Sequence, residues 1–427
     1  MYFKFKMKLI YTGNNLESLI DLAVTESGEF INSKKEIYNF LINKENLSGS
    51  YAFALILKND QVFLTRDKIG ARKLFYFYDK KKSILYISNN FINLIETCKT
   101  KEIYSVPRGG YLIIDQEKVI RKEHGFFKLN TKFEIENIKI TLSNFFKFLK
   151  FKIKKKPIIC LSGGLDSTLI TFLASQQFDN IDVVTAVLEN EPFGYKTNSK
   201  SHDFIHAKEI GAELKVNFNS IYIDPKKIFK DLTKIFKASQ DWRDYNIHCA
   251  VLNYYIGEYI SKNFNPNEYV VLTGDFMNEA FADYTSEFIE GNEYYKQPNF
   301  SQKVRQRFFL NGLDTSDREI GIFTGFGLTC IQPYSFVLEK YKLLTNQDLS
   351  EDNAKYKING SLLPKSILNK INKQKVRAQV GDSSGGILGY FIKNDMKDKK
   401  LIKVFSEEFN LNEKFMNDFI QIGVYKT

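Results

Sequence analysis

The sequence has few of the residues that build covalent or metal-bound frameworks. Its 427 residues include only four cysteines, four histidines and one tryptophan. The cysteines are far apart, form no CxxC pair and have no histidine at metal-ligand spacing. They are Cys98, Cys160, Cys249 and Cys330. The sequence therefore suggests neither a disulfide framework nor a zinc site.

Long apolar runs are also missing. No uninterrupted run reaches the roughly 18 residues that span a bilayer, and residues 1–6 lack the apolar stretch of a signal peptide. We therefore expect a cytoplasmic protein without a membrane span. The net charge of +11 would suit an acidic partner, but the lysines are scattered among many Asn and Ile residues. Nucleic acid is therefore not favoured as a partner.

The first part of the chain has the texture of short strands. Residues 51–57 and 61–65 form one pair of apolar runs around a turn, and residues 73–78 and 84–88 form another. With 43% hydrophobic and 15% aromatic residues, the chain can bury two cores. We predict a layered α+β domain over residues 1–125.

The texture changes around residues 135–156, where Phe and Lys alternate before a Lys-rich stretch and Pro157, and we assign residues 126–156 to a linker. Such a basic amphipathic segment can bind a membrane surface. We favour the alternative, a linker helix that packs its Phe face between two domains, because the segment has no long face of lysine alone.

From residue 157 to 427 strands and helices alternate. Apolar runs at residues 158–161, 182–189, 218–223 and 269–273 are separated by helical patterns. This alternation predicts an α/β fold with a parallel sheet that is covered on both faces and binds ligands at the carboxyl ends of its strands.

A glycine-rich loop follows the first of these strands and opens a helix. Its glycines let the backbone approach an anion closely, and its N–H groups and hydroxyls can surround a phosphate at the helix N-terminus. Asp166 would repel a phosphate, so we expect it to ligate a Mg²⁺ ion that bridges carboxylate and pyrophosphate. The loop residues are Ser162, Gly163, Gly164, Leu165, Asp166 and Ser167.

This loop matches the motif of the PP-loop ATP pyrophosphatases, and the chain resembles the class B asparagine synthetase and β-lactam synthetase group. A second stretch, residues 272–284, is similar to the family segment LSG-(D/E)-G-x-D-E-x-F-x-G-Y. The resemblance implies that Gly274 contributes to the nucleotide site. It also implies that Asp275 takes the place of the acidic residue at the amide-forming site of asparagine synthetases, where β-lactam synthetases have a catalytic Tyr.

Three positions further on, the family has an Asp that helps to hold Mg²⁺, whereas this chain has Asn278. An amide oxygen can ligate Mg²⁺ but brings no negative charge, which Glu279 or substrate phosphates would have to supply. A third stretch, residues 373–386, resembles the C-terminal loop in which a Lys meets the acyl-adenylate and the leaving pyrophosphate. Lys375 matches that Lys.

Two further residues, Glu319 and Asp203, are weaker matches. Glu319 is the counterpart of a Glu that orients the catalytic Tyr in β-lactam synthetases, with an ordinary surface charge as the alternative. Asp203 opens a helix and is explained equally by N-capping. Residues 241–248 are predicted either to line the acceptor pocket or to form a capped helix start.

Residues 47–54, 65–76 and 106–110 resemble the glutaminase domain of the family, which has the N-terminal nucleophile fold. Glutaminases of this kind need a Cys directly after the initiator Met, with its own amine as the base. This chain has Tyr2 there. The resemblance therefore implies a degenerate domain without glutaminase activity.

Together these features predict an AMP-forming carbon–nitrogen ligase that uses ATP and Mg²⁺. It would adenylate a small-molecule or peptide carboxylate and transfer the acyl group to an amine or ammonia. The sequence is compatible with a homodimer. The alternatives are an RNA-modifying PP-loop enzyme and a non-catalytic relic that binds a nucleotide.

Overall fold

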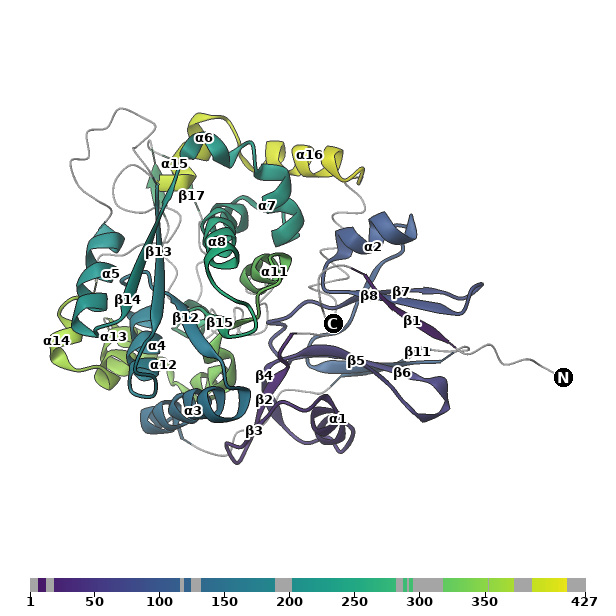
Figure 1. The fold of residues 1–427 in the computed structure, drawn as a ribbon, viewed down its shortest axis with the longest axis horizontal. Helices are drawn as coiled ribbons and strands as arrows, with labels where there is room; N and C mark the ends of the chain where they lie inside the picture. The colour runs from purple at the N-terminus through teal and green to yellow at the C-terminus, as the bar shows by residue number, and fades with distance from the viewer. Residues whose placement is uncertain are drawn as a thin grey trace.

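The computed structural model combines mainly antiparallel sheets over residues 7–123 with one parallel sheet whose strands lie between residues 156 and 331 (Figure 1). It describes residues 7–12, 19–115, 119–123, 132–188, 202–281, 287–289, 292–294, 318–351, 353–371 and 386–412. In Figure 1 the antiparallel strands lie on the right, the parallel strands lie on the left, and helix α3 (Ile135–Phe148) lies below, between the two.

The N-terminal region, residues 7–123, contains three small sheets. Their strand orders are β1-β8-β7-β9, β11-β10-β6-β5 and β3-β2-β4. All strand pairs are antiparallel except β1 with β8. The strands are β1 (Lys8–Tyr11), β2 (Leu22–Thr25), β3 (Phe30–Ile31), β4 (Leu47–Ser50), β5 (Ala52–Ile56), β6 (Val62–Arg66), β7 (Phe75–Asp79), β8 (Ile84–Ser88), β9 (Tyr104–Ser105), β10 (Gly110–Ile114) and β11 (Val119–Glu123). The strands expected at 51–57, 61–65, 73–78 and 84–88 correspond to β5, β6, β7 and β8.

Alternating side chains on β5, β6 and β10 produce the layers of this region. Successive side chains of a strand point to opposite faces of its sheet. Phe53, Phe63 and Tyr111 pack with Ile37 and other buried residues of helix α1 (Lys34–Ile42) on one face. The neighbours of these aromatic residues along each strand face β7 and β8 and form a second apolar cluster. The alternating pattern thus yields a helix layer and two sheet layers.

The C-terminal region is built on a five-stranded sheet in the order β14-β13-β12-β15-β18, in which every pair is parallel. Its strands are β12 (Lys156–Cys160), β13 (Asp182–Leu188), β14 (Asn217–Ile223), β15 (Tyr269–Leu272) and β18 (Cys330–Ile331). Helix α5 (His202–Glu213) and helix α8 (Asp244–Asn263) lie on opposite sides of β13 in Figure 1. The predicted parallel α/β sheet, covered on both faces, is confirmed.

The other described elements surround this sheet. The helices are α2 (Phe91–Cys98) in the N-terminal region, and α4 (Leu165–Ser175), α6 (Pro225–Ile228), α7 (Leu232–Ser239), α9 (Met277–Phe281), α11 (Arg318–Gly325), α12 (Asn346–Ser350), α13 (Ala354–Ile358), α14 (Lys365–Leu368), α15 (Gly386–Lys393) and α16 (Asp398–Glu408). Shorter turns of helix are η2 (Lys58–Asp60), η3 (Leu149–Ile153), η4 (Pro333–Phe336), η5 (Leu338–Leu343) and η6 (Asn359–Leu362). A small hairpin joins β16 (Glu287–Ile289) to β17 (Asn292–Tyr294).

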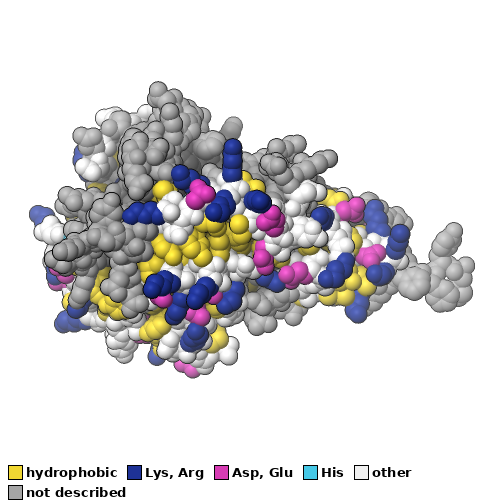
Figure 2. All heavy atoms as spheres, turned by 90° about the horizontal axis from the view of Figure 1, so that it is seen from above, with side chains coloured by type: hydrophobic (Ala, Val, Ile, Leu, Met, Phe, Trp, Pro, Cys, Tyr) yellow, Lys and Arg dark blue, Asp and Glu magenta, His cyan; other side chains and the backbone are white. Residues whose placement is uncertain are grey.

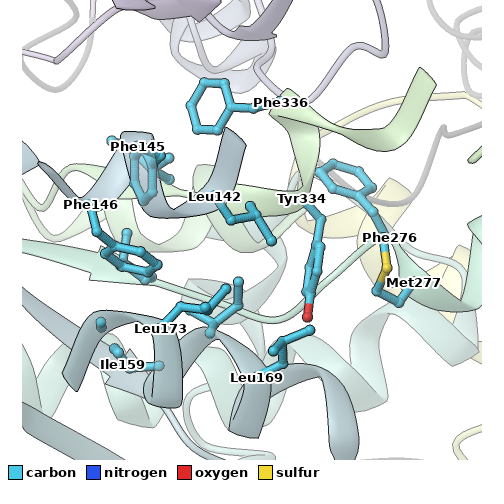
Figure 3. Packing of buried hydrophobic residues seen from close by; sticks show 14 of the residues in the cluster. Leu142, Phe145, Phe146, Ile159, Leu169, Leu173, Phe276, Met277, Tyr334 and Phe336 are labelled. Atoms are coloured by element: carbon cyan, nitrogen blue, oxygen red, sulfur yellow. The ribbon is translucent and has the colours of Figure 1, made fainter. Parts of the chain in front are cut away.

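Helix α3 buries its Phe face between the two regions, as the sequence predicted. The ring of Phe145 lies 6.1 Å from that of Phe30 in β3 and 5.0 Å from that of Phe336 in η4. Figure 3 shows Phe145, Phe146 and Phe336 in this cluster with Leu173 of α4. Because these aromatic side chains are fully or almost fully buried, the segment serves as a packing element of the fold.

Polar contacts join the two regions at separate places. The Lys68 ammonium lies 2.7 Å from a carboxylate oxygen of Glu339, and both side chains are buried. Gln240 accepts a hydrogen bond from the backbone N–H of Phe91 at 3.0 Å and donates one to the carbonyl of Asn89. The N-terminal region thus holds α7, which packs on α8 and α11, and η5, which packs on α9.

The surface agrees with the scattered charge pattern. Where Figure 2 shows described residues, Lys and Arg side chains are interspersed with Asp and Glu around an apolar area. None of the described helices combines the length and apolar character that a bilayer crossing requires.

Candidate nucleotide site at the end of β12

The predicted loop lies directly after β12, at the amino end of helix α4. Gly163 has a φ of +73°, and a Cβ there would come within 2.8 Å of the Asp203 carbonyl oxygen and 2.9 Å of the Ala207 nitrogen. Only glycine meets both the conformation and the close approach of α5 without displacement. The backbone of Asp203 therefore borders the loop, although its side chain stays only a weak candidate.

Hydroxyl groups close this loop from within. The Ser162 and Ser167 hydroxyls lie 2.9 Å apart, and the Ser162 backbone N–H donates to Ser167 Oγ at 3.1 Å. Helix α4 starts after Gly164 without a side-chain cap. The first N–H groups of a helix have no partner within the helix, so this end suits an anion.

The second predicted segment lies against the first. Strand β15 pairs with β12, and a Cβ added at Gly274 would come within 2.7 Å of the Ser167 nitrogen and 3.0 Å of the Asp166 carbonyl carbon. This contact of backbone on backbone requires glycine. It brings Asp275 and Asn278, both half-buried, to the same edge of the sheet as Asp166.

Phe276 departs from the family segment in an informative way. It takes the position of the second glycine of that segment, and its φ is +86°. A bulky residue rarely adopts this conformation, and local strain of this kind is held in place by surrounding structure. Its ring is buried, and Figure 3 shows it near Met277 and Tyr334. The segment thus keeps a backbone shape that ordinarily favours glycine.

Lys355 is a site residue that the sequence did not reveal. Its Nζ lies 2.6 Å from Asp166 Oδ2 and donates a hydrogen bond to Asn278 Oδ1 at 2.8 Å. Only 8% of Lys355 is exposed. One lysine among 61 basic residues, in a Lys- and Asn-rich stretch without a motif, gives no signal in a single sequence.

Two buried tyrosines and an asparagine fix the elements around this lysine. Asn359, directly after α13, accepts a hydrogen bond from the Tyr341 hydroxyl at 2.8 Å and donates one to the Met277 sulfur at 3.3 Å. The Tyr334 hydroxyl donates to the backbone carbonyl of Asp166 at 3.0 Å, and Figure 3 shows it pointing toward Leu169 of α4. Helix α13, helix α9 and the loop are therefore held together.

The hydroxyls of these tyrosines stay protonated. Burial, with the negative charge of Asp166 as a smaller contribution, raises the pKa of Tyr334 and the pKa of Tyr341 well above the ordinary value. Both therefore act as hydrogen-bond donors and not as bases at neutral pH.

The arrangement does not match a metal held jointly by Asp166 and Asn278. The space between their oxygens holds the Lys355 ammonium, whose charge would repel a divalent cation. Among the residues that the structure describes, no cluster of three or more His, Cys, Asp or Glu side chains could hold a metal ion. The magnesium site at these two residues remains a prediction.

The remaining predicted residues are spread more widely. Lys375 lies outside the described residues. Glu319 belongs to α11, and its side chain is outside the described part. Asp241 is buried and accepts hydrogen bonds from the backbone N–H groups of Trp242 and Arg243 at 2.8 and 2.9 Å. Helix α8 begins after Arg243 without a side-chain cap, so the acceptor pocket and the capped helix start both remain predictions for residues 241–248.

The segment that contains this loop matches a known protein family in sequence. Residues 155–318 match the sequence model of the asparagine synthase family. The matched segment runs from β12 through the loop, Gly274 and Asn278 to the start of α11. The parallel-sheet region is therefore similar in sequence to asparagine synthases over this segment. The match covers less than half of the chain, and no curated protein matches the sequence.

Three solved structures show distant similarity. The NMN synthetase of Francisella tularensis is 19% identical, with a TM-score of 0.28, over 56% of this chain and 92% of that one. The NH₃-dependent NAD synthetase of Campylobacter jejuni is 15% identical, with a TM-score of 0.24, over 44% of this chain and 77% of that one. The glutamine-dependent NAD⁺ synthetase of Acinetobacter baumannii is 13% identical, with a TM-score of 0.25, over 43% of this chain and 37% of that one.

Proposed function

We propose that this protein is an ATP-dependent ligase that forms an amide bond. It adenylates a carboxylate, releases pyrophosphate and transfers the acyl group to an amine or to ammonia. The observation that carries the proposal is the loop of residues 162–167, in which Gly163 is required by both conformation and packing at the uncapped start of α4. The family match over the same residues supports it.

The loop would bind the phosphates of ATP through its N–H groups and hydroxyls. Negative charge that develops on the transferred phosphorus oxygens is then stabilised by donors that are already in position, which needs no reorganisation during the reaction. Strand β15 places Asp275 beside this loop, where its carboxylate can orient the attacking amine or accept its proton. Lys375 and Glu319 keep the roles that the resemblance implies, as further proposals.

The nitrogen in this proposal does not come from glutamine hydrolysed by the protein itself. The cysteine nearest to the start of the sequence is Cys98. Burial raises the pKa of its thiol to about 11. A thiol with so high a pKa is almost entirely protonated at neutral pH and is a poor nucleophile. Incubation with glutamine should release no glutamate above background, and sustained release would contradict this part of the proposal.

Exchange of labelled pyrophosphate into ATP tests the first half-reaction. The experiment uses the full chain without nucleic acid, over a panel of carboxylates with and without amines. Exchange should depend on one carboxylate class, whereas dependence on RNA would favour an RNA-modifying enzyme. No exchange with any carboxylate, together with unimpaired ATP binding, would favour a non-catalytic nucleotide-binding protein.

Asp166→Asn is the informative variant in this assay. The neutral amide would no longer hold a cation, such as the Lys355 ammonium, beside the reacting phosphates, and loss of one preorganised positive charge should slow exchange by roughly a hundredfold or more. Asp182→Asn is the matched control, because Asp182 begins β13 at the opposite end of the same sheet. Equal exchange rates for Asp166→Asn and the parent would show that this loop is not the nucleotide site.

A further inference from the structure

The place between Asp166 and Asn278 already contains a cation that belongs to the chain. The Lys355 ammonium contacts Asp166 Oδ2 at 2.6 Å and Asn278 Oδ1 at 2.8 Å. The resemblance predicts a protein-held Mg²⁺ at this place. Lys355 comes from α13, an element outside the two motifs from which the site was predicted.

The charges of these three side chains balance without a metal. An aspartate at position 278 would give two carboxylates, a pair that suits a divalent cation. With Asn278, the two side chains carry only the single negative charge of Asp166, which one ammonium neutralises. A partly buried carboxylate and a buried ammonium are stable together when each is paired and hydrogen-bonded. The loss of one carboxylate and the presence of Lys355 therefore fit each other chemically.

Lys355 is also fixed from behind. Asn359 links the end of α13 to η5 through Tyr341 and to α9 through Met277. Because α9 also carries Asn278, the donor and its amide acceptor are held in one framework. These contacts hold the Lys355 ammonium in one position beside Asp166 and Asn278.

We propose that the Lys355 ammonium replaces the protein-held divalent cation at the pyrophosphate site. This inference rests on the proposed function, because it assigns a residue to the same loop. The chain then supplies its own positive charge beside the loop, and Mg²⁺ enters only in complex with the phosphates of ATP. Asp166 serves as a positioning residue that holds the ammonium, and it does not ligate a metal.

Binding of Mn²⁺ to the nucleotide-free protein tests this assignment without any enzymatic activity. Electron paramagnetic resonance should show no specific Mn²⁺ binding to the parent. The double variant Lys355→Ala with Asn278→Asp removes the ammonium and adds a carboxylate, so it should gain a Mn²⁺ site. Parent binding as tight as that of the double variant would overturn the proposal, as would a folded double variant that gains no binding.

Calorimetry with inorganic pyrophosphate in the presence of EDTA tests the other consequence. The parent should bind metal-free pyrophosphate, and Lys355→Gln should weaken this binding roughly tenfold to a hundredfold, the range of a charge-assisted contact. Lys357→Gln is the matched control, because Lys357 lies on the same helix with its side chain 58% exposed. Equal affinities for parent and Lys355→Gln would overturn the proposal.

The two experiments separate this inference from the proposed function. Circular dichroism establishes that each variant is folded before its binding is compared. If the parent binds neither ATP nor pyrophosphate under any condition, the proposed function fails, while the Mn²⁺ comparison still decides whether Lys355 excludes a divalent cation.

Discussion

Two loops of this protein contain the same residue types, but their aspartates have different kinds of partner. Residues 67–72 follow β6 in the N-terminal region, and residues 162–167 follow β12 in the parallel-sheet domain. Each contains an aspartate and a left-handed glycine, with a φ of +72° at Gly70 and +73° at Gly163. The loops differ in the groups that meet the carboxylate.

In the first loop the carboxylate turns inward. The two oxygens of Asp67 accept hydrogen bonds from the backbone N–H groups of Ala71 and Arg72 at 2.8 and 3.0 Å. Arg72 in turn pairs with Asp21 at 2.8 Å, and all of these residues are buried. The polar groups of this loop stabilise the loop itself.

In the second loop the carboxylate contacts another part of the chain. Asp166 pairs with Lys355, from a distant part of the chain, and its side chain is 21% exposed. The comparison teaches that a loop motif alone does not distinguish a structural aspartate from one at a site, whereas the identity of its partner does.

The largest expected effect on stability comes from Asp67→Ala. This change leaves two buried N–H groups without their acceptors, which should lower the free energy of unfolding by about 4 kcal/mol. Asp166→Ala should cost less, because the carboxylate of Asp166 is 21% exposed and pairs with a lysine side chain. Urea unfolding followed by circular dichroism measures both. A larger cost for Asp166→Ala would break the comparison.

Gly274→Ala tests whether the second loop depends on close packing of its neighbour. The new Cβ would overlap backbone atoms of Ser167 and Asp166, which cannot move aside as a side-chain end can. We expect a loss of about 2 kcal/mol in stability and weaker ATP binding. In Gly325→Ala the nearest atom lies 3.7 Å from the added Cβ, so this control should be neutral or slightly stabilising. Unchanged ATP binding in Gly274→Ala would contradict the described packing.

His248 shows how a buried titratable side chain behaves in an apolar setting. It packs edge-on against Phe391, and burial lowers its pKa to about 3. The unfolded chain takes up a proton below pH 6.5 and the folded chain does not, so this contribution to stability is lost as the pH falls from 6.5 toward 3.

The expected slope is about 1.4 kcal/mol per pH unit over this window. His248→Leu should remove that slope from the unfolding free energy measured between pH 6.5 and 5, while the difference between variant and parent stays constant above pH 7.5. Parallel pH dependences of the two proteins below pH 6.5 would contradict the low pKa of His248.

The smallest effect concerns Phe276, which takes the positive φ that glycine prefers. Phe276→Ala and Phe276→Gly both remove the ring, and their difference isolates the backbone conformation. The Gly variant should be the more stable of the two by about 1 kcal/mol, because a Cβ is unfavourable at this φ. The ordinary order, with Ala more stable, would argue against the conformation described here.

The sequence predicted the features that depend on local patterns. Alternating and continuous apolar runs located β5 to β8 and the parallel strands β12 to β15, because burial imposes its period on the chain. The loop at residues 162–167 was predictable because its conformation and its close contact with α5 require a glycine at position 163. The two-residue strand β18 was missed, since so short an element has no period.

Lys355 and the closing contacts of Tyr334 and Tyr341 could not be predicted, because each depends on segments that meet only after folding. The substitution of Asn278 for an acidic residue was visible in the sequence. The role of Lys355 was not visible, because only the folded structure shows that this lysine contacts Asp166 and Asn278. The difference between the two aspartate loops is likewise a property of three-dimensional partners.

The central claim is that the loop of residues 162–167 directs cleavage of ATP between its α- and β-phosphates. Product analysis by ³¹P nuclear magnetic resonance, with ATP, Mg²⁺ and the carboxylate and amine that support turnover, tests this directly. We predict AMP and pyrophosphate in equal amounts, with formation of both lost in Asp166→Asn. Formation of ADP and inorganic phosphate by the parent, in proportion to the amide product, would contradict the account.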